Sequence, residues 1–433
     1  MFFLDYMKIN ERNHLEIGGC DTVELAEQYG TPLYVMDEER IRANARRYRN
    51  AVEEFYGGNG LVLYASKALC TAALYRIIDE EGLGADVVSG GELYTALKAD
   101  FDPKKIYFHG NNKTRAELEM AVDAGVGRIV VDNAYELAML DEISASRGTV
   151  SEILFRLKPG VEAHTHEFIS TGQIDSKFGA ALETNEAFHL VEQACACKHI
   201  RLIGIHCHIG SQIFDLEPFK LAADVMLEFA REIKEKLGVV IKELNLGGGF
   251  GIQYTAEDKP LPYHQYMMAV SEVVKTSCAE KGLEFPFILM EPGRSIVGDA
   301  GITLYTVGAV KEIPNIRKYA SVDGGMGDNP RYLLYEAQYD GVLANRANAP
   351  VDDVVTVCGK CCESGDILIR DANLPAMVPG DILAVMSTGA YNYSMSSNYN
   401  RIPRPPVVLV KNGTSRVIVK RETYEQVMQN DVF

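Results

Sequence analysis

The sequence has no excess of basic residues. Its 43 lysines and arginines are outnumbered by 60 aspartates and glutamates, which gives a formal net charge of -17 at pH 7. Nucleic acids and anionic membrane surfaces attract proteins with a basic face, so this charge balance argues against both as partners. The sequence also lacks any apolar run of the roughly 18 residues that a membrane-spanning helix needs.

The opening residues Met1-Phe2-Phe3-Leu4-Asp5 are apolar but few. They lack a basic region and a convincing cleavage site, so they do not predict a secretory signal peptide. The nine cysteines are an odd number in a long chain without such a signal. We therefore expect reduced thiols and a cytoplasmic protein.

The spacing of cysteine and histidine does not predict a metal site. Cys358 and Cys361 form a CxxC pair, but a zinc site needs a second pair at suitable spacing, and Cys195 and Cys197 form only a CxC within a helical pattern. His164-Thr165-His166 offers two ligands without a matching cluster. Metal or redox use of Cys358 and Cys361 is the less favoured alternative.

A chain of 433 residues suggests about two domains. From residue 60 onward, short apolar runs alternate with helical patterns. Eight such runs, most of them followed by a helix, predict a (β/α)8 TIM barrel. The alternative, an open doubly wound sheet, would require an early dinucleotide-binding glycine motif, whereas the glycine cluster here comes late. The expected strands are 61–65, 85–89, 106–109, 128–132, 153–157, 202–208, 243–246 and 286–290.

After about residue 300, strand-like runs follow one another without helices between them. Runs 407–410 and 416–419 flank Asn412-Gly413, a dipeptide typical of a tight hairpin turn. We therefore predict a barrel over 33–300 and an all-β domain over 301–433. The N-terminal segment 1–32, with the strand-like run 14–17, is predicted to join the β-domain.

Lys67 follows the apolar run 60–64 and lies where the first predicted strand ends. A lysine that leaves a buried strand is desolvated, which lowers its pKa and frees its amine as a nucleophile. The alternative is a lysine that extends to the surface, and the local pattern alone favours it. Because the functional groups of a barrel gather at the carboxyl ends of its strands, the other strand ends help to decide between the two.

The ends of strands seven and eight carry residues suited to a phosphate. The glycines 247–249 let backbone amides approach a phosphate closely, Arg294 can hold it through a forked pair of hydrogen bonds, and Ser211 at the end of strand six can add a hydroxyl. A phosphate beside a nucleophilic lysine indicates pyridoxal phosphate. Its ring nitrogen needs a carboxylate, and Glu291 is suitably placed.

Two histidines near the end of strand six are candidates for the ring of this cofactor. His208 can stack on the ring, and alternation along the strand is expected to decide whether His206 or His208 faces the site. A structural histidine is the alternative for either residue, and it is favoured for His206.

Several motifs together resemble the bacterial diaminopimelate decarboxylase family. The resemblance covers nearly the whole chain, and several of the motifs differ in the related ornithine and arginine decarboxylases. It implies a fold-type III pyridoxal enzyme: a barrel like that of alanine racemase, a following β-domain, and a head-to-tail homodimer with shared active sites. It also implies conversion of the amino acid meso-2,6-diaminopimelate to L-lysine and CO2, the last step of lysine biosynthesis. The motifs are 64–68, 82–93, 109–113, 160–167, 207–212, 291–294, 362–366 and 389–391.

The same resemblance implies a role for each matching residue. Lys67 would carry the cofactor, Cys362 would be the acid that returns a proton to the substrate carbon, and Glu363 would read the distal amine. In the family a proline commonly follows the arginine that matches Arg331, whereas this sequence has Tyr332. Cys361 beside Cys362 leaves the choice of cysteine slightly ambiguous. The implied cofactor shell is Gly249, Ser211, Glu291, Arg294, Tyr391 and His208, and the implied substrate site is Arg294, Arg331, Tyr335, Glu363 and Tyr391.

The residues support the same reading on physical grounds. A substrate with two carboxylates and two amines needs cationic and anionic groups together, and Arg294, Arg331 and Glu363 supply them. The alternatives are a decarboxylase of another basic amino acid, a racemase of the same fold, and a homologue that only binds a partner. A binding module has no need to keep Lys67 and Cys362, which argues against the last.

Overall fold

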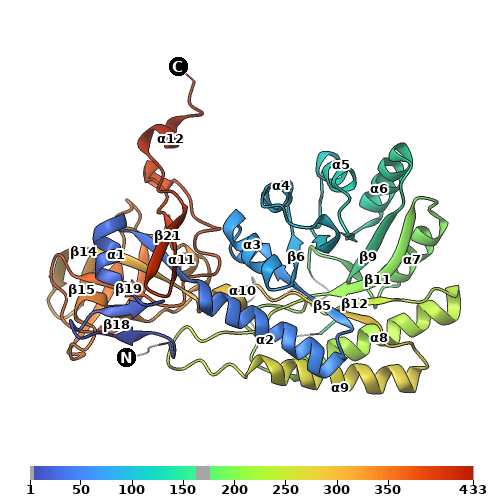
Figure 1. Ribbon diagram of the computed structural model, residues 1–433, viewed down its shortest axis with the longest axis horizontal. Helices are drawn as coiled ribbons and strands as arrows, with labels where there is room; N and C mark the ends of the chain where they lie inside the picture. Colours follow the sequence, from blue (N-terminus) through green and yellow to red (C-terminus); the bar gives the residue numbers. More distant parts are fainter. Residues whose placement is uncertain (1–3, 162–175, 433) are drawn as a thin grey trace. The chain divides into compact units, whose positions relative to one another are not determined.

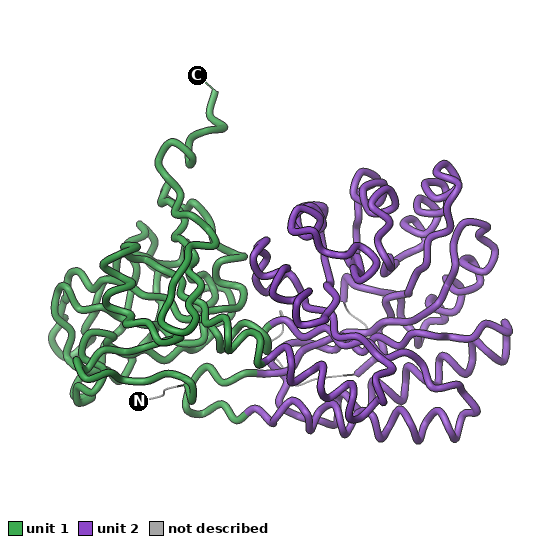
Figure 2. The backbone as a smooth tube through the Cα atoms, viewed as in Figure 1, with its two compact units in different colours: residues 1–43, 252–259, 294–433 green, residues 44–251, 260–293 purple. Residues whose placement is uncertain are grey.

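The structure is a computed structural model that describes residues 4–161 and 176–432. The pair His164 and His166, and most of the motif 160–167, lie outside the described residues. The chain divides into two compact units, which Figure 2 colours separately: unit 1 comprises 1–43, 252–259 and 294–433, and unit 2 comprises 44–251 and 260–293. Each unit is described by itself.

Unit 2 is a closed barrel of parallel strands (Figure 1). Each strand pairs with the next one along the chain, including the fourth with the fifth. The ring closes because the last strand pairs with the first. All eight predicted strands are present, so the predicted (β/α)8 barrel is confirmed. The strands are β5 (Gly60–Ala65), β6 (Gly84–Val87), β7 (Ile106–Phe108), β8 (Arg128–Val131), β9 (Ser151–Lys158), β11 (Ile200–Cys207), β12 (Glu243–Asn245) and β13 (Phe287–Met290), with a short β10 (Ala180–Ala181) beside β9.

Helices separate most of these strands, and their ends follow capping rules. α5 begins at a capping box in which the Thr114 hydroxyl accepts from the Glu117 amide, and it ends at Gly125 in the left-handed region. α6 is capped by Asn133 and ends at Gly148 in the same way. The helices are α2 (Glu38–Tyr56), α3 (Ala72–Glu80), α4 (Gly90–Lys98), α5 (Arg115–Ala124), α6 (Ala134–Arg147), α7 (Glu186–Ala196), α8 (Glu217–Leu237) and α9 (Tyr263–Lys281), with the 3-10 turns η1 (Ser66–Ala68) and η2 (Pro103–Lys105).

Unit 1 is built on a mixed sheet in the order β18-β17-β15-β14-β4-β20-β21, with β16 and β19 joined beside β14. The hairpin at Asn412-Gly413 is confirmed, with φ of 50° and 76° at the two turn residues. The long strands are β4 (Leu33–Asp37), β14 (Gly301–Ile313), β15 (Arg317–Val322), β16 (Gly341–Leu343), β17 (Asp353–Cys358), β18 (Ile367–Leu374), β19 (Ile382–Val385), β20 (Val407–Lys411) and β21 (Thr414–Val419).

The N-terminal residues form a small separate sheet and one helix in unit 1. Asp21 accepts hydrogen bonds from the amides of Val23 and Glu24 and so caps the helix that begins at Thr22. Leu15 and Ile17 pack into the same hydrophobic core as Val408. The small elements are β1 (Lys8–Ile9), β2 (Leu15–Ile17), β3 (Cys20–Asp21), α1 (Thr22–Tyr29), α10 (Arg294–Val297), α11 (Arg331–Tyr335), η4 (Ala344–Arg346), η5 (Tyr399–Arg401) and α12 (Tyr424–Met428).

The units divide at other positions than the predicted boundaries. β4 pairs antiparallel with β14 and parallel with β20, so residues 33–43 belong to unit 1 rather than to the barrel that was predicted to start at residue 33. Residues 252–259, which follow the glycine run, also belong to unit 1. Within the described residues, none of the helices combines the length and apolar character that crossing a bilayer requires.

Candidate active site

The end of β5 holds Lys67 in a tight 3-10 turn. The turn is fixed from both sides, because the Tyr75 hydroxyl donates to Ser66 Oγ at 2.8 Å and the Tyr64 hydroxyl donates to the Leu69 carbonyl at 3.0 Å. Ser66 and Ala68 are buried, whereas the Lys67 side chain is exposed in this chain. The position at the strand end is as predicted, but the prediction of a desolvated lysine is wrong for the single chain.

Glu291 follows β13, and its carboxylate lies in a cluster of donors. Asn245 Nδ2 donates to Oε1 at 2.6 Å, and its orientation is set because Asn245 Oδ1 accepts from the Gly247 amide. His109 Nε2 lies 2.8 Å from Oε1, and His206 Nε2 lies 3.1 Å from Oε2. Burial raises the pKa of Glu291, but the two histidines hold the pKa well below its usual value, so this carboxylate is an anion at neutral pH.

His206 lies within β11, whereas His208 follows the strand. Residues two apart along a strand share a face, so alternation does not select one of the two. Burial lowers the pKa of His206 to about 4, which makes it a neutral imidazole beside Glu291. His208 Nδ1 accepts from the Gly248 amide at 3.3 Å, and burial together with the charges of Lys67 and Arg156 lowers the pKa of His208.

The glycine run after β12 forms a closely packed loop. A Cβ on Gly248 would lie 2.1 Å from the Glu291 carbonyl oxygen, and one on Gly249, at φ +110°, would lie 2.4 Å from the Gly210 carbonyl oxygen. The Ile213 amide donates to the Gly249 carbonyl at 2.9 Å, which ties this loop to the loop of Ser211. Only glycine fits at these two positions, and glycine backbone amides are the kind that can approach a phosphate closely. With an anionic carboxylate and a histidine nearby, the barrel residues fit pyridoxal phosphate.

In unit 1, four of the predicted residues lie together. Arg294 and Arg331 are buried, and their Cζ atoms lie 4.8 and 5.9 Å from the centroid of the Tyr391 ring. Tyr391 has a φ of +69°, a conformation that non-glycine residues rarely adopt outside functional sites. Arg331 also lies 6.0 Å from the Tyr335 ring, because the two are one helical turn apart in α11.

Tyr332 is the second residue of α11, where the family commonly has proline. Proline is tolerated in the first turn of a helix because the amide there has no intrahelical partner. A tyrosine at the same place is also compatible with the helix. The four-residue spacing that brings the Tyr335 ring close to Arg331 is therefore retained.

The turn after β17 distinguishes Cys362 from Cys361. The Asp366 carboxylate accepts from the Cys361 amide at 2.7 Å and from the Met326 amide at 2.6 Å, which fixes the turn. Burial raises the pKa of Cys361 to about 11, so it stays an inert thiol. Cys362 and Glu363 are exposed, and the Cys362 amide donates to Asn400 Oδ1 at 2.7 Å. Of the two cysteines, Cys362 is the accessible one.

Sequence reasoning missed several residues of the site. His109 stood in a motif of the resemblance without a role, and nothing in its local pattern pointed to Glu291. Tyr254 and Tyr339 contact the two arginines, and no motif in the sequence pointed to either tyrosine. Among the described residues, His109, His206 and Glu291 have ligand atoms within 4.8 Å of one another. His206 is hydrogen-bonded to the Glu291 carboxylate and His109 is in ion-pair contact with it, so the three groups do not require an ion.

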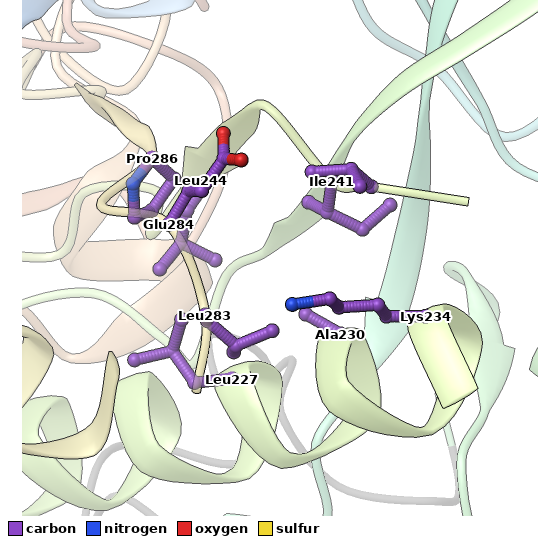
Figure 3. A pocket seen from close by; sticks show the side chains of 9 residues that line it. Leu227, Ala230, Lys234, Ile241, Leu244, Leu283, Glu284 and Pro286 are labelled. Carbon is purple, nitrogen blue, oxygen red and sulfur yellow. The ribbon is translucent and has the colours of Figure 1, made fainter. Parts of the chain in front are cut away.

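Two cavities in unit 2 lie away from these residues. The cavity of Figure 3, about 10 Å³, lies between α8 and the starts of β12 and β13, and Lys234 on its wall already donates to the Gly282 carbonyl. It holds at most one water. The second, about 370 Å³, is lined by Arg128 and Arg201 at the amino ends of strands. Both arginines already pair with Glu152.

Comparisons with known proteins identify the chain. A family model for the pyridoxal binding domain of pyridoxal-dependent decarboxylases matches residues 38–298. A diaminopimelate decarboxylase of Bacillus methanolicus is 53% identical over 422 residues, which cover 98% of each chain. A solved diaminopimelate decarboxylase from M. jannaschii is 37% identical with a TM-score of 0.93, covering 99% of this chain and 98% of that chain. A structure of the M. jannaschii enzyme in complex with L-lysine is 36% identical with a TM-score of 0.92 and the same coverage.

The barrel, the residues at its strand ends and the family model define a pyridoxal-phosphate-dependent decarboxylase. Within that class, the chain belongs to the diaminopimelate decarboxylase family. The fold class, the cofactor and the carboxy-lyase class predicted from the sequence are thereby confirmed.

Proposed function

We propose that this protein removes one carboxylate from meso-2,6-diaminopimelate and releases L-lysine and CO2, the last step of lysine biosynthesis. The observation that carries this proposal is Arg331. Its guanidinium is buried, donates to the Tyr339 hydroxyl at 2.7 Å, and has no carboxylate within ion-pair distance in the described part of the chain. A buried cation requires a compensating anion, and a substrate carboxylate can supply it.

Arg294 and Arg331 are assigned to the carboxylate that the product keeps. An ion pair with the departing carboxylate would stabilise the ground state, because CO2 leaves as a neutral molecule, and so would raise the barrier. Arg294 is also assigned to the cofactor shell. The Tyr335 and Tyr391 rings beside the arginines complete this part of the substrate site. Glu363 is assigned to the distal ammonium.

The barrel residues are assigned to the cofactor. The Lys67 amine would hold it covalently, the Gly249 backbone and the Ser211 hydroxyl would hold its phosphate, and the His208 imidazole would contact its ring. When bound, pyridoxal phosphate supplies an electron sink for the pair left on carbon as CO2 departs. The anionic Glu291 carboxylate would favour the protonated form of the ring nitrogen.

Cys362 is assigned to the last proton transfer. The bond between carbon and the departing carboxylate breaks with its electron pair left on carbon, and Cys362 Sγ gives that carbon a proton. Cys362 and Glu363 are exposed in the single chain. This exposure supports a homodimer in which the partner subunit's Cys362 completes the site, so that a two-fold axis makes both sites equivalent. The nine cysteines are all unpaired, which supports a cytoplasmic enzyme.

The test is an assay of the purified protein for CO2 and L-lysine from meso-2,6-diaminopimelate, with L-ornithine and L-arginine as alternative substrates. We expect kcat/KM for diaminopimelate to exceed the other values by at least about 1,000-fold, because buried cations left without an anion are strongly penalised. Similar values for ornithine would overturn the substrate assignment. Racemisation of the substrate without release of CO2 would overturn the assignment of the protein as a decarboxylase. A visible absorbance band lost on borohydride reduction identifies the cofactor.

A further inference from the structure

The two buried arginines of unit 1 share the same aromatic neighbours. The Tyr254 ring centroid lies 5.6 Å from Arg294 Cζ and 5.0 Å from Arg331 Cζ. The Tyr391 ring lies 4.8 and 5.9 Å from the same two atoms. Both guanidinium groups therefore lie against one pair of tyrosine rings, which are buried or partly buried.

The tyrosine hydroxyls also orient the arginines. The Tyr254 hydroxyl accepts from Arg294 Nη1, and the Tyr339 hydroxyl accepts from Arg331 Nη1 at 2.7 Å. Tyr339 is itself fixed, because its hydroxyl accepts from Asn392 Nδ2 at 3.3 Å and its ring packs edge-on against Tyr254 with centroids 5.4 Å apart. The Tyr339 hydroxyl is the one hydrogen-bond partner of the Arg331 guanidinium in the described residues.

Two like charges in a buried site repel each other and lose hydration, so the arrangement needs compensation. The negative faces of tyrosine rings attract cations, and hydroxyl oxygens accept from them. Burial lowers the pKa of Arg331, but Tyr254, Tyr339 and Tyr391 raise it above the usual value overall. The tyrosines therefore keep the charge of Arg331 in place before an anion binds.

We propose that Tyr254 and Tyr339 are positioning residues that aim Arg294 and Arg331 at the carboxylate kept by the product. This inference rests on the proposed function, since it assigns a purpose to tyrosines that touch neither substrate nor cofactor in that proposal. Tyr254 lies five residues after Gly249, the last glycine of the run assigned to the phosphate, and belongs to the segment 252–259 of unit 1. It therefore connects, along the chain, the loop assigned to the cofactor and the arginines assigned to the substrate.

Two ligands separate an effect on the carboxylate from a general effect on the site. L-Lysine has one carboxylate and two amines, and pentane-1,5-diamine has the same amines without the carboxylate. A residue that orients the arginines should alter binding of lysine and leave binding of the diamine unchanged. A residue that only maintains packing should alter both.

The experiment uses holoenzymes of Tyr339→Phe and Tyr254→Phe, with Tyr56→Phe as a matched control. Tyr56 is also buried and donates one hydroxyl hydrogen bond, to the Met267 carbonyl at 3.1 Å, but it ends α2 and belongs to unit 2, whereas both arginines belong to unit 1. Calorimetric titration gives the Kd of each ligand. We expect each of the two variants to raise the Kd of L-lysine and the KM for diaminopimelate by roughly 10- to 100-fold. This is the range for loss of a hydrogen bond to a charged group. The Kd of the diamine, the cofactor content and all values for Tyr56→Phe should change by less than about threefold.

The inference would be overturned if both variants raised the Kd of L-lysine and the Kd of the diamine equally. It would also be overturned if the Kd of L-lysine did not change. If Tyr339→Phe does not fold, Tyr254→Phe decides, and Tyr254→Leu then removes the ring as well and should weaken lysine further. A wild-type enzyme that does not decarboxylate diaminopimelate would refute the proposed function instead, and lysine binding by the same variants would still test the tyrosines.

Discussion

Replacing Glu291 by glutamine isolates the charge of the carboxylate from its shape. Oε1 accepts from Asn245 and lies beside His109, whereas Oε2 lies beside His206 alone. A glutamine can place its oxygen at the first position and its amide nitrogen toward His206. Neutral His206 can then accept at Nε2 by moving its proton to Nδ1, which has no partner in the described residues in either case. We therefore expect Glu291→Gln to fold and to bind the cofactor.

The size of the catalytic effect follows from the lost charge. Two opposite unit charges about 3 Å apart interact by about 5 kcal/mol at an effective dielectric of about 20, which is an upper bound. The amide oxygen keeps part of this interaction. Loss of one preorganised electrostatic contact lowers kcat by about 100- to 1,000-fold in other enzymes, and we expect a decrease of this size in Glu291→Gln.

The assay combines kcat for lysine formation with cofactor content and the nitrogen-15 chemical shift of ring-labelled cofactor, which reports protonation of the ring nitrogen. Glu81→Gln is the control, because Glu81 is equally buried and pairs with Arg46 on the outer helices. It should lose stability without losing kcat. An unchanged kcat in Glu291→Gln, or a ring nitrogen that stays protonated, would refute the reasoning.

Three further predictions follow from the same structure. Lys67→Ala should remain within about 0.5 kcal/mol of wild-type stability, because Lys67 is exposed, and should lose turnover and the borohydride-sensitive absorbance. Lys67→Ala mixed with Cys362→Ala should recover about a quarter of wild-type activity, because random pairing makes half of the dimers hybrid and each hybrid has one intact site. Burial raises the pKa of Asp328 to about 7, so its carboxyl is protonated more readily in the folded state. The stability it adds is full below about pH 4 and is lost as pH rises through 7, by about 3 kcal/mol between pH 5 and pH 8. Asp328→Asn should remove that loss in urea unfolding measured at both pH values.

Each of these has a clear contrary result. A pyridoxyl group mapped to another lysine would contradict the assignment of Lys67. Hybrid dimers that form without recovering activity would place Cys362 in the site of its own chain. Equal pH dependence of wild type and Asp328→Asn would show that Asp328 does not titrate in this range.

The barrel could be predicted because each of its strands is an apolar run with a boundary that the sequence marks. β4 is also an apolar run, but the sequence of a buried strand does not indicate which strands it pairs with. β4 pairs with β14 and β20, which lie far along the chain. β15 and β18 were missed because residues such as Arg317 and Asp371 lie within them and pair with each other at 3.0 Å. Polar residues on an exposed sheet face hide the alternation of a strand.

The places of Lys67 and Glu291 after strand ends could be predicted, because each follows an apolar run that the sequence marks. The site was not predictable where function depends on contacts between distant segments. His109 and Glu291 meet because β7 and β13 belong to one barrel, and no local pattern links them. The exposure of Lys67 was also beyond the sequence, since burial depends on what covers the strand end.

The pairing of β4 with strands far along the chain means that β4 stays unpaired during much of the synthesis of the chain. β4 is complete at Asp37, but its neighbours β14 and β20 begin only at Gly301 and Val407. At a synthesis rate of about 5–20 residues per second, the ribosome needs roughly 13–50 s to reach the first neighbour and still longer for the second. During that time the barrel strands are synthesised, while the five-residue strand β4 has unpaired backbone N–H and C=O groups on both of its edges. Nascent chains stalled before Gly301 should therefore bind a chaperone through residues 33–37 or aggregate through them.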